Sequence, residues 1–254
     1  MLQPKQCSVN SQTFSRHRVW QSAPQSALAT AASHGRLVAI MPANAKNLVS
    51  HRIIRALTPK DALGQLGGHI KRGCAHPVNP RTGKTMALVS ALPLSADSDK
   101  MVLSFMDRSD SSETFDAHPA KGDNAVLIVP RAEVHTSSLN GVCAGDWKGL
   151  KVAFGEAMEE PMDLDIDPTG LDLKESDRWV DLVDEIGCDC TKLGGYPLWT
   201  NAPIEVEELT GKKLRFHHRI AGDLVDLKLG DGGVVYVFVE IDGNGGALCW
   251  QQAL

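Results

Sequence analysis

Short apolar runs separated by turn residues fill much of the chain. Runs rich in β-branched and other apolar residues predict strands at 125–130, 151–158 and 234–239. Glycine-rich stretches at 230–233 and 242–246 lie between the closing strands and predict turns. The pattern therefore predicts a strand-rich fold.

Helical spacing of apolar residues occurs in fewer places. The segment RWVDLVDEI predicts a helix at 178–186, because Trp179, Leu182, Val183 and Ile186 fall on one face. A second helix is expected over 44–57, where the apolar face consists of Leu48, Ile53, Ile54 and Leu57. Both helices would flank the strands.

The N-terminal residues differ in charge from the rest. Residues 1–60 contain no Asp or Glu and eight Lys or Arg. Within them, 1–21 show no periodicity, 22–35 predict a short helix and 36–41 a strand. An organellar transit peptide would share this composition, but the folded pattern at 36–57 favours a basic N-terminal arm with helices over residues 1–60.

Two segments carry the same elements in the same order. Leu-Gly-Gly occurs at 66–68 and 193–195, and Thr-Gly-Lys at 82–84 and 210–212. The offsets are 127 and 128 residues, and the apolar runs that follow lie about 133 residues apart. Such self-similarity predicts an internal duplication. The repeats would cover about 61–130 and 188–254, within one compact unit at 61–254.

Composition limits the class of protein. With 254 residues, 43% of them hydrophobic and 22% charged, the chain resembles an ordinary soluble domain. No apolar run approaches the ~18 residues of a membrane span, and the polar first 25 residues do not predict a secretory signal. The six cysteines are scattered, which favours reduced thiols in a cytoplasm over a disulfide framework.

One stretch is strongly acidic. Between Glu156 and Asp177 there are nine acidic residues and one base, Lys174, a local charge of −8 against −5 for the whole chain. Such a run is either a solvated loop or a surface that attracts a basic partner. Both interpretations remain open from the residues alone.

Residues with catalytic or metal-binding chemistry do not form a recognisable motif. His217 and His218 are adjacent, and on a strand their rings should point to opposite faces. His69 and His76 have no counterparts at the matching offset in the second repeat, and Asp231-Gly232-Gly233 reads as a hairpin turn rather than a phosphate loop. No nucleophile elbow, P-loop, zincin or dinucleotide motif occurs. We therefore expect no metal and no cofactor, and a binding protein rather than an enzyme.

The second half resembles the YwqG-like family of bacterial proteins. The first family element is matched by Leu193, Gly194, Gly195, Pro197 and Trp199. The second is matched by Gly230, Asp231, Gly233, Tyr236 and Phe238. The resemblance implies a cytoplasmic α+β fold, internally duplicated and built on antiparallel β-sheet with a few flanking helices, and it brings no assigned reaction.

Family members that act as immunity proteins beside secreted toxins suggest a function. We expect an immunity protein that neutralises a toxin with a basic, nuclease-like domain, for example an effector of a type VI secretion system, without direct nucleic-acid or membrane contact. The alternative is a small-molecule or nucleotide-binding protein, or an unrecognised enzyme, using the groove between the repeats. The candidate partner-binding residues are Glu156, Glu159, Glu160, Asp163, Asp165, Asp167, Tyr196 and Trp199.

Overall fold

The computed structural model describes most of the chain between Leu48 and Gln252. Every described residue belongs to the unit Pro42–Leu254. The helix expected at 22–35 and the strand expected at 36–41 lie outside the described residues. These residues are 48–58, 60–71, 76–107, 119–136, 148–161, 164, 171–186, 190–221, 224, 227, 229 and 232–252.

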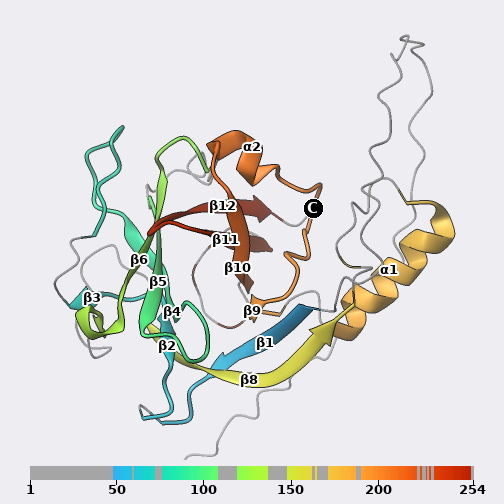
Figure 1. The fold of residues 1–254 in the computed structure, drawn as a ribbon, viewed down its shortest axis with the longest axis horizontal. Helices are drawn as coiled ribbons and strands as arrows, with labels where there is room; N and C mark the ends of the chain where they lie inside the picture. Colours follow the sequence, from blue (N-terminus) through green and yellow to red (C-terminus); the bar gives the residue numbers. More distant parts are fainter. Residues whose placement is uncertain are drawn as a thin grey trace, which may run out of the picture. The chain divides into compact units, whose positions relative to one another are not determined.

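Strands predominate among the described residues (Figure 1). The first strands are β1 (Leu48–Arg55), β2 (Gly64–Leu66), β3 (Ile70–Lys71), β4 (Ala87–Pro93), β5 (Lys100–Met106), β6 (Asn124–Pro130) and β7 (His135–Thr136). They are followed by β8 (Leu150–Glu160), β9 (Lys192–Gly194), β10 (Leu214–Ala221), β11 (Gly233–Glu240) and β12 (Gly246–Gln252). The helices include α1 (Leu173–Ile186), α2 (Val206–Thr210) and a 3-10 turn at Arg131–Glu133. The β-rich α+β class and the helix around 178–186 are confirmed.

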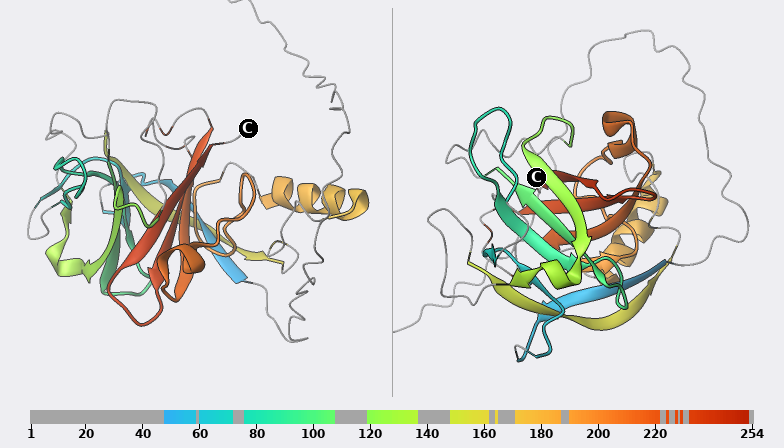
Figure 2. Two further views of the ribbon diagram at one scale, coloured as in Figure 1. Left: turned by 90° about the horizontal axis from the view of Figure 1, so that it is seen from above. Right: turned by 60° about the vertical axis from the view of Figure 1, so that its left-hand side comes forward.

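Ten of these strands form one antiparallel sheet. Their order is β12-β11-β10-β9-β1-β8-β2-β4-β5-β6, while β3 and β7 form a separate pair. The sheet curls until its two ends meet, because Leu127 of β6 bridges Gly245 just before β12. The amide of Ile128 also donates to the carbonyl of Asn244 at 2.9 Å. Figure 2 shows this closure, with β6 beside the start of β12.

Alternating residues of the curled sheet build separate apolar clusters on its two faces. The inner cluster joins both ends of the sheet and includes Leu66, Val89, Ile220 and Val237. On the outer face, one cluster lies around β4 and β5 and another around β10, β11 and β12. The sheet therefore contributes to cores on both sides, which explains the continuous burial along β4 and β11.

The helix expected over 44–57 is wrong for residues 48–55, which form β1. This strand lies near the middle of the sheet and pairs with β8 on one side and β9 on the other. Opposite Arg52, β8 has one extra residue between Phe154 and Ala157, which forms a β-bulge. The β-branched residues of β1 suit a strand paired on both edges, and tertiary pairing overrides a weak helical pattern.

The two Leu-Gly-Gly segments adopt corresponding conformations. All four glycines have positive φ, from 60° at Gly67 to 76° at Gly194, and each segment ends a short strand, β2 or β9. The Thr-Gly-Lys glycines also correspond. Gly83 and Gly211 have φ of 69° and 67°, and each amide donates to the carbonyl four residues earlier, at 2.9 and 2.8 Å.

The strand order relates the two parts of the chain to each other. We call residues 48–136 the first half and residues 148–252 the second half. From one end, the sheet holds four second-half strands, then β1, then β8, then four first-half strands. The first strand of each half therefore pairs inside the other half.

Candidate functional site

The acidic stretch divides between surface and interior. Glu156 and Glu159 of β8 are exposed, whereas Glu160 at the end of the same strand is fully buried. Asp163, Asp165 and Asp167 lie outside the described residues. Glu160 therefore does not belong to the surface on which we expected it, and only part of the acidic run can be placed.

Helix α1 carries further exposed carboxylates. It packs its apolar side, including Val183 and partly buried Trp179, against Tyr196 and Leu198 in a small cluster that Met158 of β8 joins. Its remaining sides carry exposed carboxylates. We call the acidic face the exposed set Asp172, Glu175, Asp177, Asp181, Asp184 and Glu185.

Glu160 forms a buried ion pair with Lys192 of β9. The Lys192 Nζ to Glu160 Oε1 distance is 2.5 Å, and both side chains are fully buried. The other carboxylate oxygen accepts the backbone N–H of Tyr196 at 2.7 Å. Burial lowers the pKa of Lys192, and the adjacent Glu160 carboxylate acts in the opposite direction. The carboxylate thus anchors the second Leu-Gly-Gly turn to the end of β8.

Tyr196 and Trp199 differ in exposure. Tyr196 is buried, with 6% of its surface exposed, so its ring serves the packing under α1 rather than the surface. Trp199 is half-buried, with its ring centroid 4.5 Å from that of Tyr236 and 5.9 Å from that of Phe238. The two elements behind the YwqG-like resemblance therefore pack directly on each other.

A hydroxyl fixes the loop between these aromatic residues. The Tyr236 hydroxyl accepts the Thr200 N–H at 2.8 Å and lies 3.2 Å from the Leu198 carbonyl, to which it donates. Leu198 has a φ of 52°, which is strained for a residue with a side chain. Tyr236 thus holds a strained loop in place, which gives this motif residue a structural role.

His217 and His218 do not point to opposite faces, contrary to the sequence expectation. The pairing of β10 with β11 skips one residue between Phe216 and His218, so His217 is the extra residue of a β-bulge. A bulge turns two successive side chains toward the same side. The Nδ1 atoms of the two rings are 2.6 Å apart, and both residues are buried, at 3% and 0% exposure.

These histidines belong to a chain of buried hydrogen bonds. His218 Nε2 lies 2.8 Å from Ser90 Oγ, which lies 2.5 Å from Ser104 Oγ. At the other end, His217 Nε2 lies 3.1 Å from the carbonyl of Pro93. Burial lowers the pKa of His217 to about 4 and that of His218 well below its usual range. Both imidazoles are therefore neutral near pH 7.

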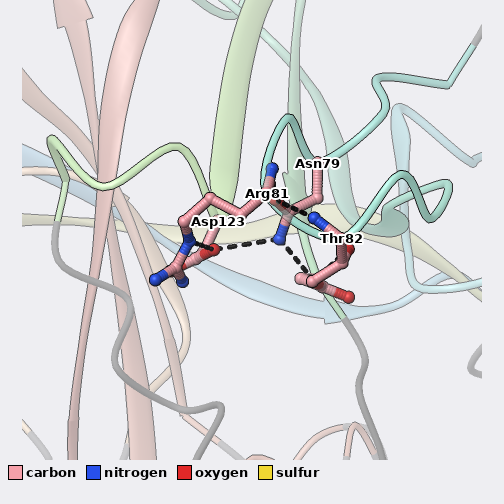
Figure 3. Close-up of polar contacts among 5 residues, drawn as sticks. Asn79, Arg81, Thr82 and Asp123 are labelled. Carbon is pink, nitrogen blue, oxygen red and sulfur yellow. Dashed lines mark hydrogen bonds and ion pairs between the residues drawn. The ribbon is translucent and has the colours of Figure 1, made fainter.

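A polar cluster at the first Thr-Gly-Lys turn was not anticipated (Figure 3). Buried Asn79 donates from Nδ2 to Asp107 and to Asp123, the latter at 2.9 Å. Its Oδ1 accepts the N–H groups of Arg81 and Thr82 at 2.8 and 3.3 Å. Burial alone would raise the pKa of Asp123, but hydrogen bonds from Arg81 and Asn79 lower it overall. The cluster joins the ends of β5 and β6 to the turn.

Within the described ranges, no group of three or more His, Cys, Asp or Glu side chains is placed to hold a metal ion. Cys190 is a free, buried thiol whose pKa burial raises, and its neighbour Cys188 lies outside the described residues. Among the helices of that same part of the chain, none has the length and apolar character to cross a membrane.

Comparison with known proteins identifies no relative. No family model matches the sequence, and no curated protein matches it significantly.

Proposed function

We propose that this protein acts by binding a basic partner protein through the acidic face, as an immunity protein binds its toxin. The supporting observation is the exposure of carboxylates along α1 and at Asp172 just before it. Within α1, five acidic residues stand against Lys174 and Arg178. An acidic surface of this kind speeds encounter with a basic protein and disfavours nucleic acid.

The toxin class comes from the YwqG-like resemblance and from charge. Enzymes that cut nucleic acid present a basic surface to phosphates, and an acidic inhibitor can cover that surface. Members of the YwqG-like family that serve as immunity proteins provide the precedent. On this proposal, the protein neutralises a nuclease-type effector in the cytoplasm.

Charge reversal on the acidic face tests this proposal. We expect Asp177→Lys, Asp181→Lys, Asp184→Lys and Glu185→Lys together to slow association with the toxin at least about tenfold and to abolish protection of a toxin-expressing cell. These residues are exposed, and exposed substitutions usually cost little stability. Association rates would be measured by surface plasmon resonance, and folding by circular dichroism.

A matched variant separates the position of the charges from their number. Asp97→Lys, Glu133→Lys, Glu208→Lys and Asp242→Lys change the net charge equally at exposed positions outside the acidic face. This control should keep protection and most of the association rate. Equal effects of the two variants, or full protection by the first, would contradict the proposal. Raising the salt concentration should also slow the wild-type association.

We also infer that the described part of the chain arose by duplication of a half. Its support is the set of matching conformations at the Leu-Gly-Gly and Thr-Gly-Lys turns. The β-bulges agree as well, since the extra residues Val89 in β4 and His217 in β10 are 128 positions apart, the offset of the Thr-Gly-Lys turns. Both halves then contribute the same strands, with their first strands exchanged.

A further inference from the structure

The His217–His218 chain connects the two halves inside the curled sheet. Ser90, Ser104 and Pro93 belong to the first half, and both histidines belong to the second. The chain crosses between the halves twice, from Ser90 to His218 at 2.8 Å and from Pro93 to His217 at 3.1 Å. It runs through an otherwise apolar interior, because His218 lies opposite Val237 and Leu193 of the inner cluster.

The partners fix the position of every proton in this chain. The carbonyl of Pro93 can only accept, so His217 carries its proton on Nε2. A neutral His217 then accepts through Nδ1, and His218 must donate from its own Nδ1. His218 Nε2 is left to accept from the Ser90 hydroxyl, which in turn accepts from Ser104. The neutral chain therefore satisfies each ring nitrogen once.

An added proton has no favourable position. On His217 Nδ1 it would meet the proton of His218 across a 2.6 Å gap, so this bond would break. On His218 Nε2 it would reverse the serine hydroxyls and leave a full positive charge in an apolar interior. Burying an uncompensated charge is costly, so the structure would open or shift instead.

Charged groups on the surrounding strands do not offset that charge. On β10, Arg215 lowers the pKa of His217 further, after burial. Arg219 of β10 and Lys192 of β9 lie opposite each other, one position from His218 and Leu193 and so on the other face. The described strand β4 carries no charged residue, and β5 and β11 carry one only at their ends, Lys100 and Glu240.

We propose that the His217–His218 chain is a pH-sensitive latch between the two halves, closed while both imidazoles are neutral and released by protonation. The proposal does not depend on the partner-binding function. Its mechanical basis is that the chain joins β4 to β10, which are far apart in the sheet order and meet across the interior. Loss of these bonds would separate the halves along the inner cluster first.

The direction of the pH dependence follows from the lowered pKa values. An unfolded histidine titrates near 6.5, whereas in the folded protein the pKa of His217 is about 4 and that of His218 is also lowered. The unfolded state therefore takes up more protons between these values, and stability falls as the pH drops below about 6.5 toward 4. Two such groups change the unfolding equilibrium constant by up to about 100-fold per pH unit.

Urea unfolding of the full chain between about pH 7.5 and pH 4.5 tests the latch. We expect the wild type to lose stability steeply below pH 6.5 and His217→Gln/His218→Gln to show a much flatter profile. His51→Gln is the matched control, because His51 is half-buried outside the chain and stacks on Phe154. Its profile should remain as steep as that of the wild type.

Two measurements on the wild-type protein keep the test decisive if the double variant does not fold. Nitrogen-15 NMR at pH 7 should show neutral rings protonated on Nε2 in His217 and on Nδ1 in His218. Between pH 7 and pH 5, amide protection should fall more in β4 and β10 than in β1 and β8. A charged ring at pH 7, the opposite tautomers, or uniform loss of protection would overturn the latch.

Discussion

Replacing Glu160 by alanine should destabilise the fold by about 3–5 kcal/mol, the largest effect expected from a single charged residue here. The variant leaves Lys192 fully buried without the carboxylate that it contacts at 2.5 Å. It also leaves the N–H of Tyr196 without its acceptor in the interior. Urea unfolding monitored by circular dichroism would give the change in free energy of unfolding.

A matched double variant distinguishes the cost of leaving Lys192 buried without its carboxylate from the contribution of the ion pair itself. Glu160→Leu/Lys192→Met removes both charges, and apolar replacement of a buried ion pair is often close to neutral. We therefore expect the double variant to be more stable than Glu160→Ala. A cost below about 1 kcal/mol for Glu160→Ala, the range of exposed ion pairs, would contradict the buried pair.

Local sequence patterns predicted the strands and the helix whose own residues show the matching periodicity. The runs around 125–130, 151–158 and 234–239 became β6, β8 and β11, and the helical spacing at 178–186 became the C-terminal part of α1. In these segments side-chain periodicity and propensity agree with the packing. The order of strands in the sheet could not be predicted from local patterns, because β1 of the first half pairs with β8 and β9 of the second half.

Local patterns also do not show distant partners or irregularities in a strand, which explains the errors at individual side chains. Glu160 looked like one more carboxylate of an acidic run, since its partner Lys192 lies 32 positions later in the sequence. The two histidines were assigned to opposite faces because a regular strand alternates, and a single extra residue in β10 breaks that alternation. Asn79 gave a weak signal in advance, as Asn before Pro favours a turn, but Asp107 and Asp123 are 28 and 44 residues away.

Gly195→Ala should destabilise the protein much more than Gly211→Ala, although the two glycines have nearly the same backbone conformation. Their φ values are 73° and 67°, so a side chain costs about 1–2 kcal/mol at either position. A Cβ at Gly211 meets no atom within 4 Å, whereas one at Gly195 would overlap the carboxylate of Glu160. That carboxylate cannot move without leaving Lys192.

The same substitution in a protein that lacks the Glu160 carboxylate tests whether the overlap with this carboxylate causes the difference. In a Glu160→Ala protein the carboxylate is absent, so Gly195→Ala should cost only the backbone term of about 1–2 kcal/mol, close to Gly211→Ala. In the wild type it should cost at least about 2 kcal/mol more, since the clash displaces a buried ion pair. Additive effects across this double-mutant cycle, measured by urea unfolding, would show that Gly195 and Glu160 act independently. Strong non-additivity would establish that the second Leu-Gly-Gly turn is glycine-rich in order to bring its backbone against the Glu160 carboxylate.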